Sequence, residues 1–389
     1  MDAAFSAELH FVSDPIFRIS ARDIQASMDV QQRPLPVPIR TATWFVPPFY
    51  HVTYGGLFTI FRFIEGLTHR GVTNRVVIFD DPLFNAARAL SMVCAHFPDL
   101  ASLEIVVLDS SDTLSSLAPT DIAFCTWWPS AYLLLRFNQT NRKYYFVQDF
   151  EPAFYEAGSR YALAESTYRF GYYGVVNTPG VLRAIRGRYG MKGASFVPAV
   201  DSRYYYPSQR TAPDSRPRIF FYCRPRSRRN AFELGLLTIL ELLDRFSEGV
   251  EIVTAGEAWD EADYGLKGRI TNLGLLSTPA EVGDLYRTCQ IGFVYMLSKH
   301  PSYQPLEFMA CGMTVVSNRN EDNYWLLRDR HNCLLAEPSP TAMADAISEL
   351  ISDRELLERL RQAGLEAVST DWEGELDQVW QSLSSDRFD

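Results

Sequence analysis

The sequence lacks the residue patterns that build metal sites, disulfide frameworks and membrane-spanning helices. Its six cysteines and six histidines are scattered over 389 residues, with no Cys-x-x-Cys, His-x-x-x-His or His-Glu-x-x-His spacing. A zinc site or a disulfide framework requires clustered spacing. No apolar run approaches the about 20 residues that a membrane helix needs. We therefore expect reduced, buried thiols, no membrane-spanning helix and no bound metal.

Two fingerprints of common enzyme classes are also missing. The Gly-x-Gly-x-x-Gly of nicotinamide oxidoreductases does not occur, and neither does the Gly-x-Ser-x-Gly of serine hydrolases. The net charge of −10 argues against nucleic acid as a partner, because a phosphate backbone needs a broad basic face. The segment Met1–Ala4 is not a basic start followed by an apolar core, so we expect no secretory signal and a cytoplasmic protein.

The chain is long enough for two domains of ordinary size, each with its own core. After a Pro-containing lead-in over 1–40, short apolar strands alternate with helices through 41–205, which is typical of a parallel sheet covered on both faces. The expected strands are 43–46, 75–79, 103–108, 122–126, 144–147 and 174–177, with helices over 57–69 and 84–96.

The same alternation restarts after a polar break at about 201–217. It predicts a second α/β domain over 206–370, and a final helix in 371–389. The expected strands are 218–223, 251–255, 291–295, 314–317 and 332–335, with helices over 231–246, 279–289, 340–352 and 354–368. The predicted fold class is therefore α/β, with two Rossmann-like, doubly wound parallel-sheet domains facing a cleft between them.

Two groups of residues in the first predicted domain follow strands and are candidates for a site. Gly55 and Gly56 stand between a strand and a helix, where a ligand can approach the backbone closely; a simple tight turn is the alternative. Asp149 directly ends another strand, so its carboxylate is a candidate to orient or deprotonate a hydroxyl, or only to cap the turn. Glu151 precedes Pro152 and can instead open the next helix.

A run of four arginines, Arg224 to Arg229, follows the first strand of the second domain. Guanidinium groups bind phosphate oxygens in pairs, and open α/β sheets bind ligands at the carboxyl ends of strands. The run therefore predicts an anion site in an acidic protein, with a solvated basic loop or a localisation-like patch as the alternatives.

The most informative segment is 291–317, where a brief helix is expected between two buried strands. Pro305 suits the opening turn and Gly312 suits the helix exit. Glu307 in the first turn is well placed to accept hydrogen bonds from two sugar hydroxyls, while a simple partnership with the helix dipole is the alternative.

The segment around Glu307 resembles the nucleotide-sugar signature of GT4-type glycosyltransferases, which have the GT-B fold. The resemblance implies that Glu307 binds the nucleotide ribose, that Arg224 and Arg229 bind the diphosphate, and that Tyr303 and Gln304 lie beside them. It also implies that Gly55 and Gly56 lie next to the donor phosphates and the acceptor. The first glutamate of the family's pair is missing, because Lys299 stands eight positions before Glu307. The metal-binding Asp-x-Asp of other glycosyltransferases is absent at the strand ends, so arginine rather than a metal ion is expected to neutralise the leaving group.

More specifically, Gln148–Pro152, the arginine run, Tyr303 and Glu307 resemble WsaF-type bacterial rhamnosyltransferases over about residues 41–383. That resemblance implies a metal-independent, retaining transfer of L-rhamnose from dTDP-β-L-rhamnose, or another dTDP- or UDP-linked sugar, onto a cell-surface glycan. Asp149 and Arg224 are then the candidate catalytic residues.

The implied partners are a nucleotide-sugar donor and a glycan or lipid-linked glycan acceptor. Peripheral contact with the inner face of the plasma membrane and contact with other glycan-assembly enzymes fit the same role. Three other readings stay open: a catalytically silent GT-B module within a larger glycan-assembly protein, a sugar-nucleotide epimerase of similar fold, and an oxidoreductase that lacks its usual fingerprint.

Overall fold

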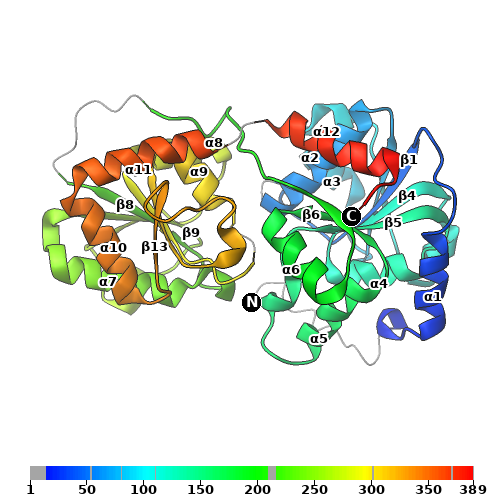
Figure 1. Cartoon of the computed structure of the whole chain (residues 1–389), viewed down its shortest axis with the longest axis horizontal. Helices are drawn as coiled ribbons and strands as arrows, with labels where there is room; N and C mark the ends of the chain where they lie inside the picture. Colours follow the sequence, from blue (N-terminus) through cyan, green and yellow to red (C-terminus); the bar gives the residue numbers. More distant parts are fainter. Residues whose placement is uncertain are drawn as a thin grey trace. The chain divides into compact units, whose positions relative to one another are not determined.

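The computed structural model describes residues 15–52, 55–79, 81–109, 111–208, 216–299, 302–368 and 371–388, without the side chains of Ser111, Asp112 and Arg228. The described chain divides into two compact units (Figure 1). The first unit takes the chain up to Thr178 together with Leu182–Phe196 and the segment from Glu375 onward. The second takes Pro179–Val181 and Val197–Gly374.

The first unit is built on a seven-stranded sheet in the order β3-β2-β1-β4-β5-β6-β7, with every pair of neighbours parallel. The order reverses direction between β1 and β4, and ligands of open α/β sheets bind beside such a reversal, at the carboxyl ends of the strands. The strands are β1 (Thr41–Val46), β2 (Thr73–Ile78), β3 (Glu104–Val107), β4 (Thr120–Cys125), β5 (Thr140–Val147), β6 (Tyr173–Asn177) and β7 (Gly193–Phe196). The α-helices are α1 (Ala21–Val30), α2 (Gly55–His69), α3 (Ala86–Cys94), α4 (Trp128–Arg136), α5 (Ser159–Ser166), α6 (Pro179–Tyr189) and α12 (Trp372–Ser385).

The second unit has a six-stranded parallel sheet in the order β10-β9-β8-β11-β12-β13, with its reversal between β8 and β11. Its strands are β8 (Arg218–Cys223), β9 (Glu251–Gly256), β10 (Thr271–Asn272), β11 (Ile291–Val294), β12 (Thr314–Asn318) and β13 (Cys333–Ala336). Its α-helices are α7 (Phe232–Phe246), α8 (Pro279–Thr288), α9 (Gln304–Ala310), α10 (Pro340–Ser352) and α11 (Arg354–Ala367). The prediction of two doubly wound parallel sheets is confirmed.

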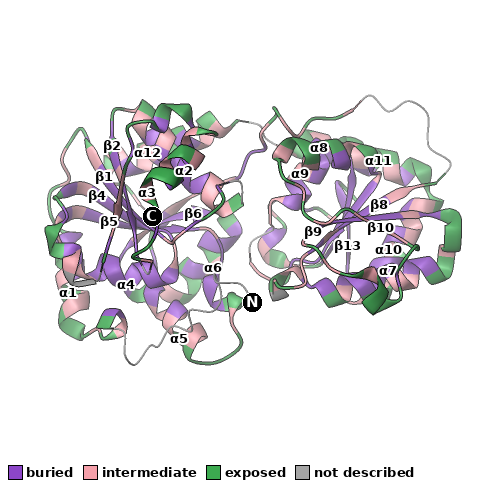
Figure 2. Cartoon of the chain, turned by 180° about the vertical axis from the view of Figure 1, so that it is seen from behind, coloured by how far each residue is buried: buried purple, intermediate pink, exposed green. Residues whose placement is uncertain are grey.

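Both sheets are buried on their two faces (Figure 2). In the first unit the indole of Trp44 stacks on Phe124 with 3.9 Å between ring centroids, and its Nε1 donates to Asn74 Oδ1 at 2.9 Å. The polar atom of this large side chain is thereby satisfied inside the core, as buried indoles require.

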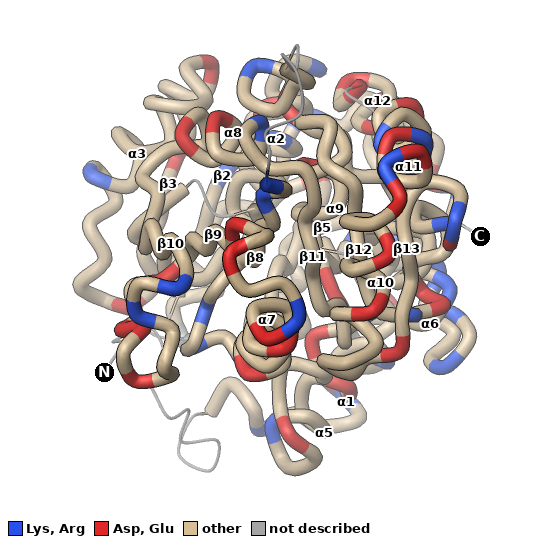
Figure 3. Tube along the Cα trace, turned by 90° about the vertical axis from the view of Figure 1, so that its left-hand side faces the viewer, with Lys and Arg blue, Asp and Glu red and all other residues tan. Residues whose placement is uncertain are grey.

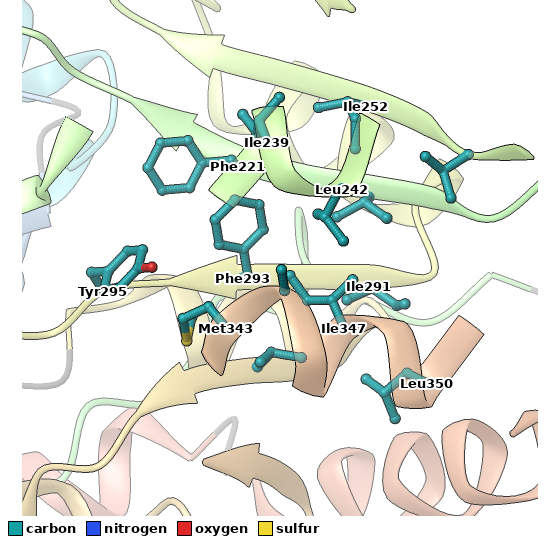
Figure 4. Close-up of a cluster of buried hydrophobic side chains, with 14 of the residues drawn as sticks. Phe221, Ile239, Leu242, Ile252, Ile291, Phe293, Tyr295, Met343, Ile347 and Leu350 are labelled. Carbon is teal, nitrogen blue, oxygen red and sulfur yellow. The ribbon is translucent and has the colours of Figure 1, made fainter. Parts of the chain in front are cut away.

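In the second unit, α7 and α10 cover one face of the sheet, and α8 and α9 pack against the other. Figure 4 shows the first of these layers, where Phe221 of β8 and Phe293 of β11 stack with 4.6 Å between ring centroids. Gly235 of α7 must be glycine, because an added Cβ would lie 1.9 Å from the Phe221 ring.

Charged residues lie mostly on helices and loops rather than on strands (Figure 3). Among the described residues, no helix combines the length and the apolar character needed to cross a bilayer.

Two segments depart from the sequence prediction. The lead-in contains α1, whose N-terminus is fixed by a reciprocal capping box between Ser20 and Asp23. Gln31, which follows α1, exchanges two hydrogen bonds with the backbone of Lys143 in β5, so this segment packs on the first sheet. The strands β7 and β10 were not predicted, because β7 (Gly-Ala-Ser-Phe) has no β-branched residue to indicate a strand and β10 is only two residues long.

The end of the described chain is anchored in the first unit. Asp386 forms a two-pronged ion pair with the buried Arg142 of β5, and its Oδ1 accepts from Arg142 Nε at 2.8 Å. The Phe388 ring stacks on Tyr173 of β6 with 4.8 Å between centroids. The two units also divide after Phe196, earlier than the predicted boundary at 205.

Lys143 is a fully buried lysine in β5. Its Nζ donates to Leu135 O at 3.1 Å and to Asn138 Oδ1 at 2.8 Å. Burial lowers the pKa of Lys143 to about 7, with Arg33 adding to the effect. Between that pKa and the ordinary value, the unfolded chain holds a proton that the folded chain does not, so stability rises with pH.

We predict that the stability of Lys143→Met relative to wild type decreases by about 2–3 kcal/mol between pH 6 and pH 9. The methionine does not titrate, so the difference isolates the lysine from other groups. Urea unfolding at pH 6, 7.5 and 9 measures this difference. A difference that stays constant with pH would show that Lys143 keeps its charge in the folded protein.

Candidate functional site

Gly55 and Gly56 open α2 at the carboxyl edge of the first sheet. An added Cβ at Gly56 would lie 3.2 Å from Nε2 of Gln148, the residue that follows β5. The structure therefore brings Gly56 next to Gln148, the residue before Asp149, although Gly56 and Gln148 are 92 positions apart in the sequence.

Asp149 and Glu151 both follow β5 and both are buried. The Oδ1 atom of Asp149 accepts a hydrogen bond from the backbone N–H of Phe150 at 2.7 Å. Glu151, in a 3₁₀ turn (Glu151–Phe154), accepts from the backbone N–H of Trp128 at 2.6 Å and from the Tyr145 hydroxyl at 3.1 Å.

Glu151 therefore holds the first turn of α4 and ties β5 to it. Trp128 is the first residue of α4, so its backbone N–H has no partner within the helix. A carboxylate is also favoured at this end of a helix. Burial, with the nearby Glu151 carboxylate adding to it, raises the pKa of Tyr145 and Tyr168 well above the ordinary range. Both hydroxyls thus stay protonated and can donate.

Arg224 lies directly after β8, at the reversal point of the second sheet. Its Nε donates to Glu257 Oε1 at 3.0 Å, and Glu257 Oε2 accepts from the backbone N–H of Arg226 at 3.2 Å. Glu257 follows β9, the neighbour of β8, so one carboxylate fixes both the guanidinium and the turn that carries it.

Arg229 lies in a 3₁₀ turn (Arg228–Asn230) and is exposed. Two successive hydrogen bonds, from Ser227 N to Arg224 O at 3.0 Å and from Asn230 N to Ser227 O at 2.9 Å, fold the arginine run compactly before α7. The run therefore presents cations at the carboxyl edge of β8.

Glu307 lies in the first turn of α9, as the sequence predicts. The helix ends on Gly312, whose φ of 76° is left-handed. Gly312 N donates to Met309 O and Met313 N donates to Phe308 O, both at 2.9 Å, which is the paired pattern of a Schellman motif.

Two tyrosines stand beside the carboxylate of Glu307, a half-buried residue. Tyr205, from the segment after the first unit, and Tyr286 of α8 both direct their hydroxyls to it. Burial raises the pKa of Glu307 to about 7, and the two hydrogen bonds limit the rise. The two rings are nearly parallel, with 6.2 Å between centroids. Glu307 therefore changes charge near neutral pH.

The remaining predicted donor residues surround the start of α9. Tyr303 precedes the helix and packs partly buried on the apolar layer beneath it, while the buried Gln304 opens it. Lys299, which stands where the family has its first glutamate, pairs with Asp322 at 2.9 Å.

Among the described residues, one group has the geometry to hold a cation. Glu65, His69 and Asp99 offer ligand atoms within 4.8 Å of one another. This group lies at the last turn of α2, whose first turn is at the carboxyl edge of the sheet, so it lies away from Gly55 and Asp149.

Sequence reasoning missed three residues of the second unit that shape the candidate site. Glu257 directly follows β9, and Asp149 lies two positions after β5. The expectation that a carboxylate at the carboxyl end of a strand belongs to a site, which we applied to Asp149, therefore also points to Glu257. Tyr205 and Tyr286 carry no local signal, because their contact with Glu307 depends on the packing of α8 against α9.

Two domain families of known proteins match the chain, one in each structural unit. Residues 50–178 match the WsaF N-terminal domain, and residues 217–348 match the WsaF C-terminal domain. Both matches fall within the structural units that contain the candidate residues.

A curated relative and several solved structures are also similar. The O-antigen biosynthesis protein RfbC of Myxococcus xanthus is 44% identical over 349 residues, which cover 89% of this chain; the chain spans 27% of that protein. The sucrose-phosphate synthase of Thermosynechococcus elongatus matches with a TM-score of 0.68 at 13% identity, covering 90% of this chain and all of that one. HepE of Anabaena, in complex with UDP and glucose, matches with a TM-score of 0.65 at 16% identity, covering 89% of this chain and all of that one.

These likenesses at low identity establish the fold, while the paired domain matches establish the family. The arginine run after β8 and the glutamate of α9 occupy the expected places within the second domain. The chain belongs to the WsaF family and has the two-domain GT-B fold of glycosyltransferases.

Proposed function

We propose that the protein is a metal-independent glycosyltransferase that moves a sugar from a nucleoside diphosphate to a hydroxyl of a growing cell-surface glycan. The observation that carries this proposal is the arrangement of the second unit, in a chain that matches both WsaF domains. There a cationic loop and a hydroxyl-binding carboxylate follow β8 and β11, the two strands at the sheet reversal.

Arg224 and Arg229 bind the diphosphate of the donor in this proposal. Negative charge builds on the diphosphate as the bond to the sugar breaks, and fixed guanidinium groups stabilise that charge without reorganising. Glu257 supports Arg224, because its carboxylate accepts from Nε and fixes the orientation of the planar guanidinium that binds phosphate oxygens.

Glu307 binds the ribose of the nucleotide. An ionised carboxylate has about four acceptor positions, and the hydroxyls of Tyr205 and Tyr286 use two of them. The remaining positions suit the ribose hydroxyls. Tyr303, just before the helix, and Gln304, its first residue, lie about one turn from Glu307, beside the expected path of the donor.

The first unit binds the acceptor. Gly55 and Gly56 let a ligand approach the start of α2 closely, and the neighbouring Asp149 orients or deprotonates the acceptor hydroxyl. Glu151 serves as the support for this edge, since it is fully engaged with α4 and Tyr145.

The transferred sugar is L-rhamnose, from dTDP-β-L-rhamnose, and the transfer retains the anomeric configuration. The resemblance to WsaF-type rhamnosyltransferases supports the sugar and the base. HepE, which binds UDP and glucose, has the same fold at 16% identity, so the fold itself accepts other nucleotides. Retention fits attack on the same face of the sugar as the leaving group, through an oxocarbenium-like state.

The acceptor is a glycan or a lipid-linked glycan in the cytoplasm, at the inner face of the plasma membrane. The name of the M. xanthus relative, an O-antigen biosynthesis protein, supports a role in cell-surface glycan assembly alongside other enzymes. Transfer of radiolabelled rhamnose from dTDP-β-L-rhamnose to a lipid-linked glycan tests the proposal. A wild-type protein that neither transfers nor hydrolyses any dTDP- or UDP-sugar would contradict it.

A second candidate function is a catalytically silent nucleotide-binding module within a larger glycan-assembly protein. Two observations favour it: the chain spans 27% of its M. xanthus relative, and Lys299 replaces an acidic residue of the GT4 pattern. Nucleotide binding without transfer or donor hydrolysis would support this alternative.

We predict that Arg224→Ala lowers kcat at least about a hundredfold, because it removes a partner of the transition-state charge. Arg245→Ala is the matched control, since Arg245 pairs with Glu241 and Asp345 away from the site. Steady-state rates with saturating donor measure both variants. Near-normal turnover in Arg224→Ala would remove the role given to this arginine.

We predict that wild type loses about 2 kcal/mol of stability relative to Glu307→Gln as pH rises from 4.5 to 7.5. The pKa of Glu307 is raised to about 7, so the folded protein keeps a carboxyl proton that the unfolded chain releases above its ordinary pKa. The stability that Glu307 gives the folded state is therefore lost as the pH rises through about 7. Chemical unfolding across this range measures the difference. Tyr286→Phe should move the transition to higher pH, because it removes a hydrogen bond that favours the charged form. A flat difference would show an ordinary, solvated carboxylate.

We predict that EDTA leaves turnover unchanged, because the arginines neutralise the leaving diphosphate. Rates before and after chelation, with magnesium added back, provide the measurement. A strict magnesium requirement would overturn the metal-free mechanism.

A further inference from the structure

The segments that follow β11 and β12, including the first turn of α9, contain buried polar atoms with no hydrogen-bond partner. These atoms are Gln304 Oε1, both amide atoms of Asn323, and the Trp325 indole Nε1. The Asn323 side chain is 1% exposed and Gln304 is 6% exposed. Burying a polar group without a partner costs stability, so such groups in native proteins need an explanation.

The two loops lie together at one edge of the sheet. Strands β11 and β12 are parallel neighbours, so their carboxyl ends meet. Asn320 Nδ2 donates to Met296 O at 3.0 Å and to Ser298 O at 2.5 Å, and Asn318 Oδ1 accepts from Met296 N at 2.6 Å. The unpartnered groups therefore stand in a pair of loops that neighbouring side chains bind to each other.

The chemistry of these atoms selects the kind of ligand that satisfies them. Gln304 Oε1 and one Asn323 atom are acceptors, and a diphosphate offers no hydrogen to them. A sugar hydroxyl both donates and accepts, so it can satisfy either end of an amide. The amide of Asn323 can be placed in either of two orientations that exchange its oxygen and nitrogen. The conclusion is the same for both, because neither amide atom has a hydrogen-bond partner.

We propose that Asn323, with Gln304, forms the subsite that recognises the hydroxyls of the transferred sugar. This inference rests on the proposed function, because it assigns part of the donor to the second unit. It gives the segment after β12 a role in donor specificity, separate from the arginines that bind the diphosphate and from Glu307 on the ribose.

The enclosure of Asn323 requires its loop to shift when the sugar enters. The ion pair between Lys299 and Asp322 connects the two loops, and its side chains are 37% and 21% exposed. A pair this accessible to water contributes little stability, so breaking it adds little to the cost of moving the Asp322–Asn323 segment, while Asn318 and Asn320 keep the bases of the two loops joined.

The test compares two buried asparagines of the same unit. Asn332 is the matched control: its Nδ2 donates to Leu326 O at 2.8 Å and its Oδ1 accepts from Arg328 N at 2.8 Å. Asn323→Leu should keep or raise Tm, because it removes unsatisfied polar atoms, whereas Asn332→Leu should lower Tm by breaking satisfied hydrogen bonds. Asn323→Ala removes the same polar atoms without placing a larger side chain in the buried site, so it tests whether the size of leucine causes the effect.

Calorimetric titration with dTDP, dTDP-β-L-rhamnose and UDP-glucose provides the second measurement. Asn323→Leu and Asn323→Ala should weaken nucleotide-sugar binding about tenfold, the loss of one net hydrogen bond, and leave the Kd for dTDP nearly unchanged.

Two results would overturn the subsite alone: a fall of Tm in Asn323→Leu as large as that in Asn332→Leu, or unchanged binding of a nucleotide-sugar that wild type binds. A wild-type protein that binds none of these compounds would overturn both the subsite and the proposed function.

Discussion

Burial of both faces of two parallel sheets is the constraint on which the rest of the structure depends. Strands enclosed on two sides must be apolar, so polar chemistry is confined to the loops at the ends of the strands. The reversals of strand order, between β1 and β4 and between β8 and β11, then decide which loops stand apart enough to receive a ligand. Gly55, Arg224 and Glu307 all follow strands at or next to these reversals.

The carboxylates at these edges are held by different kinds of partner, and the partner determines what each can do. Glu257 faces a guanidinium and so fixes a cation. Glu151 receives a helix N–H and a tyrosine hydroxyl, and so holds the scaffold. Glu307 has two tyrosine hydroxyls as partners, and burial raises its pKa to about 7, so its charge changes near neutral pH. Three residues of the same chemical type thus have three different electrostatic roles.

The sequence predicted most of the architecture, because long apolar strands and amphipathic helices carry local periodicity. The helix over 231–246 and the brief helix around Glu307 agree with α7 and α9 within a residue or a turn. The segment before β1 was read as a lead-in, since α1 becomes meaningful only through the contact of Gln31 with β5, 112 residues away. The contact of Tyr205 and Tyr286 with Glu307 could not be predicted from the sequence for the same reason, because tertiary packing brings these residues together. The roles of all the candidate residues, in both units, stay predictions, because their surroundings fit a site without identifying a ligand.

The anchoring of Asp386 and Phe388 on β5 and β6 has a consequence for synthesis of the protein. The second unit is encoded between the two portions of the first. A ribosome therefore releases the residues that complete the first unit only after it has translated the whole second unit. Until then Arg142 lacks its carboxylate, and the ring of Tyr173 lacks its stacking partner. The part of the molecule that emerges first is thus the part that can finish assembling last.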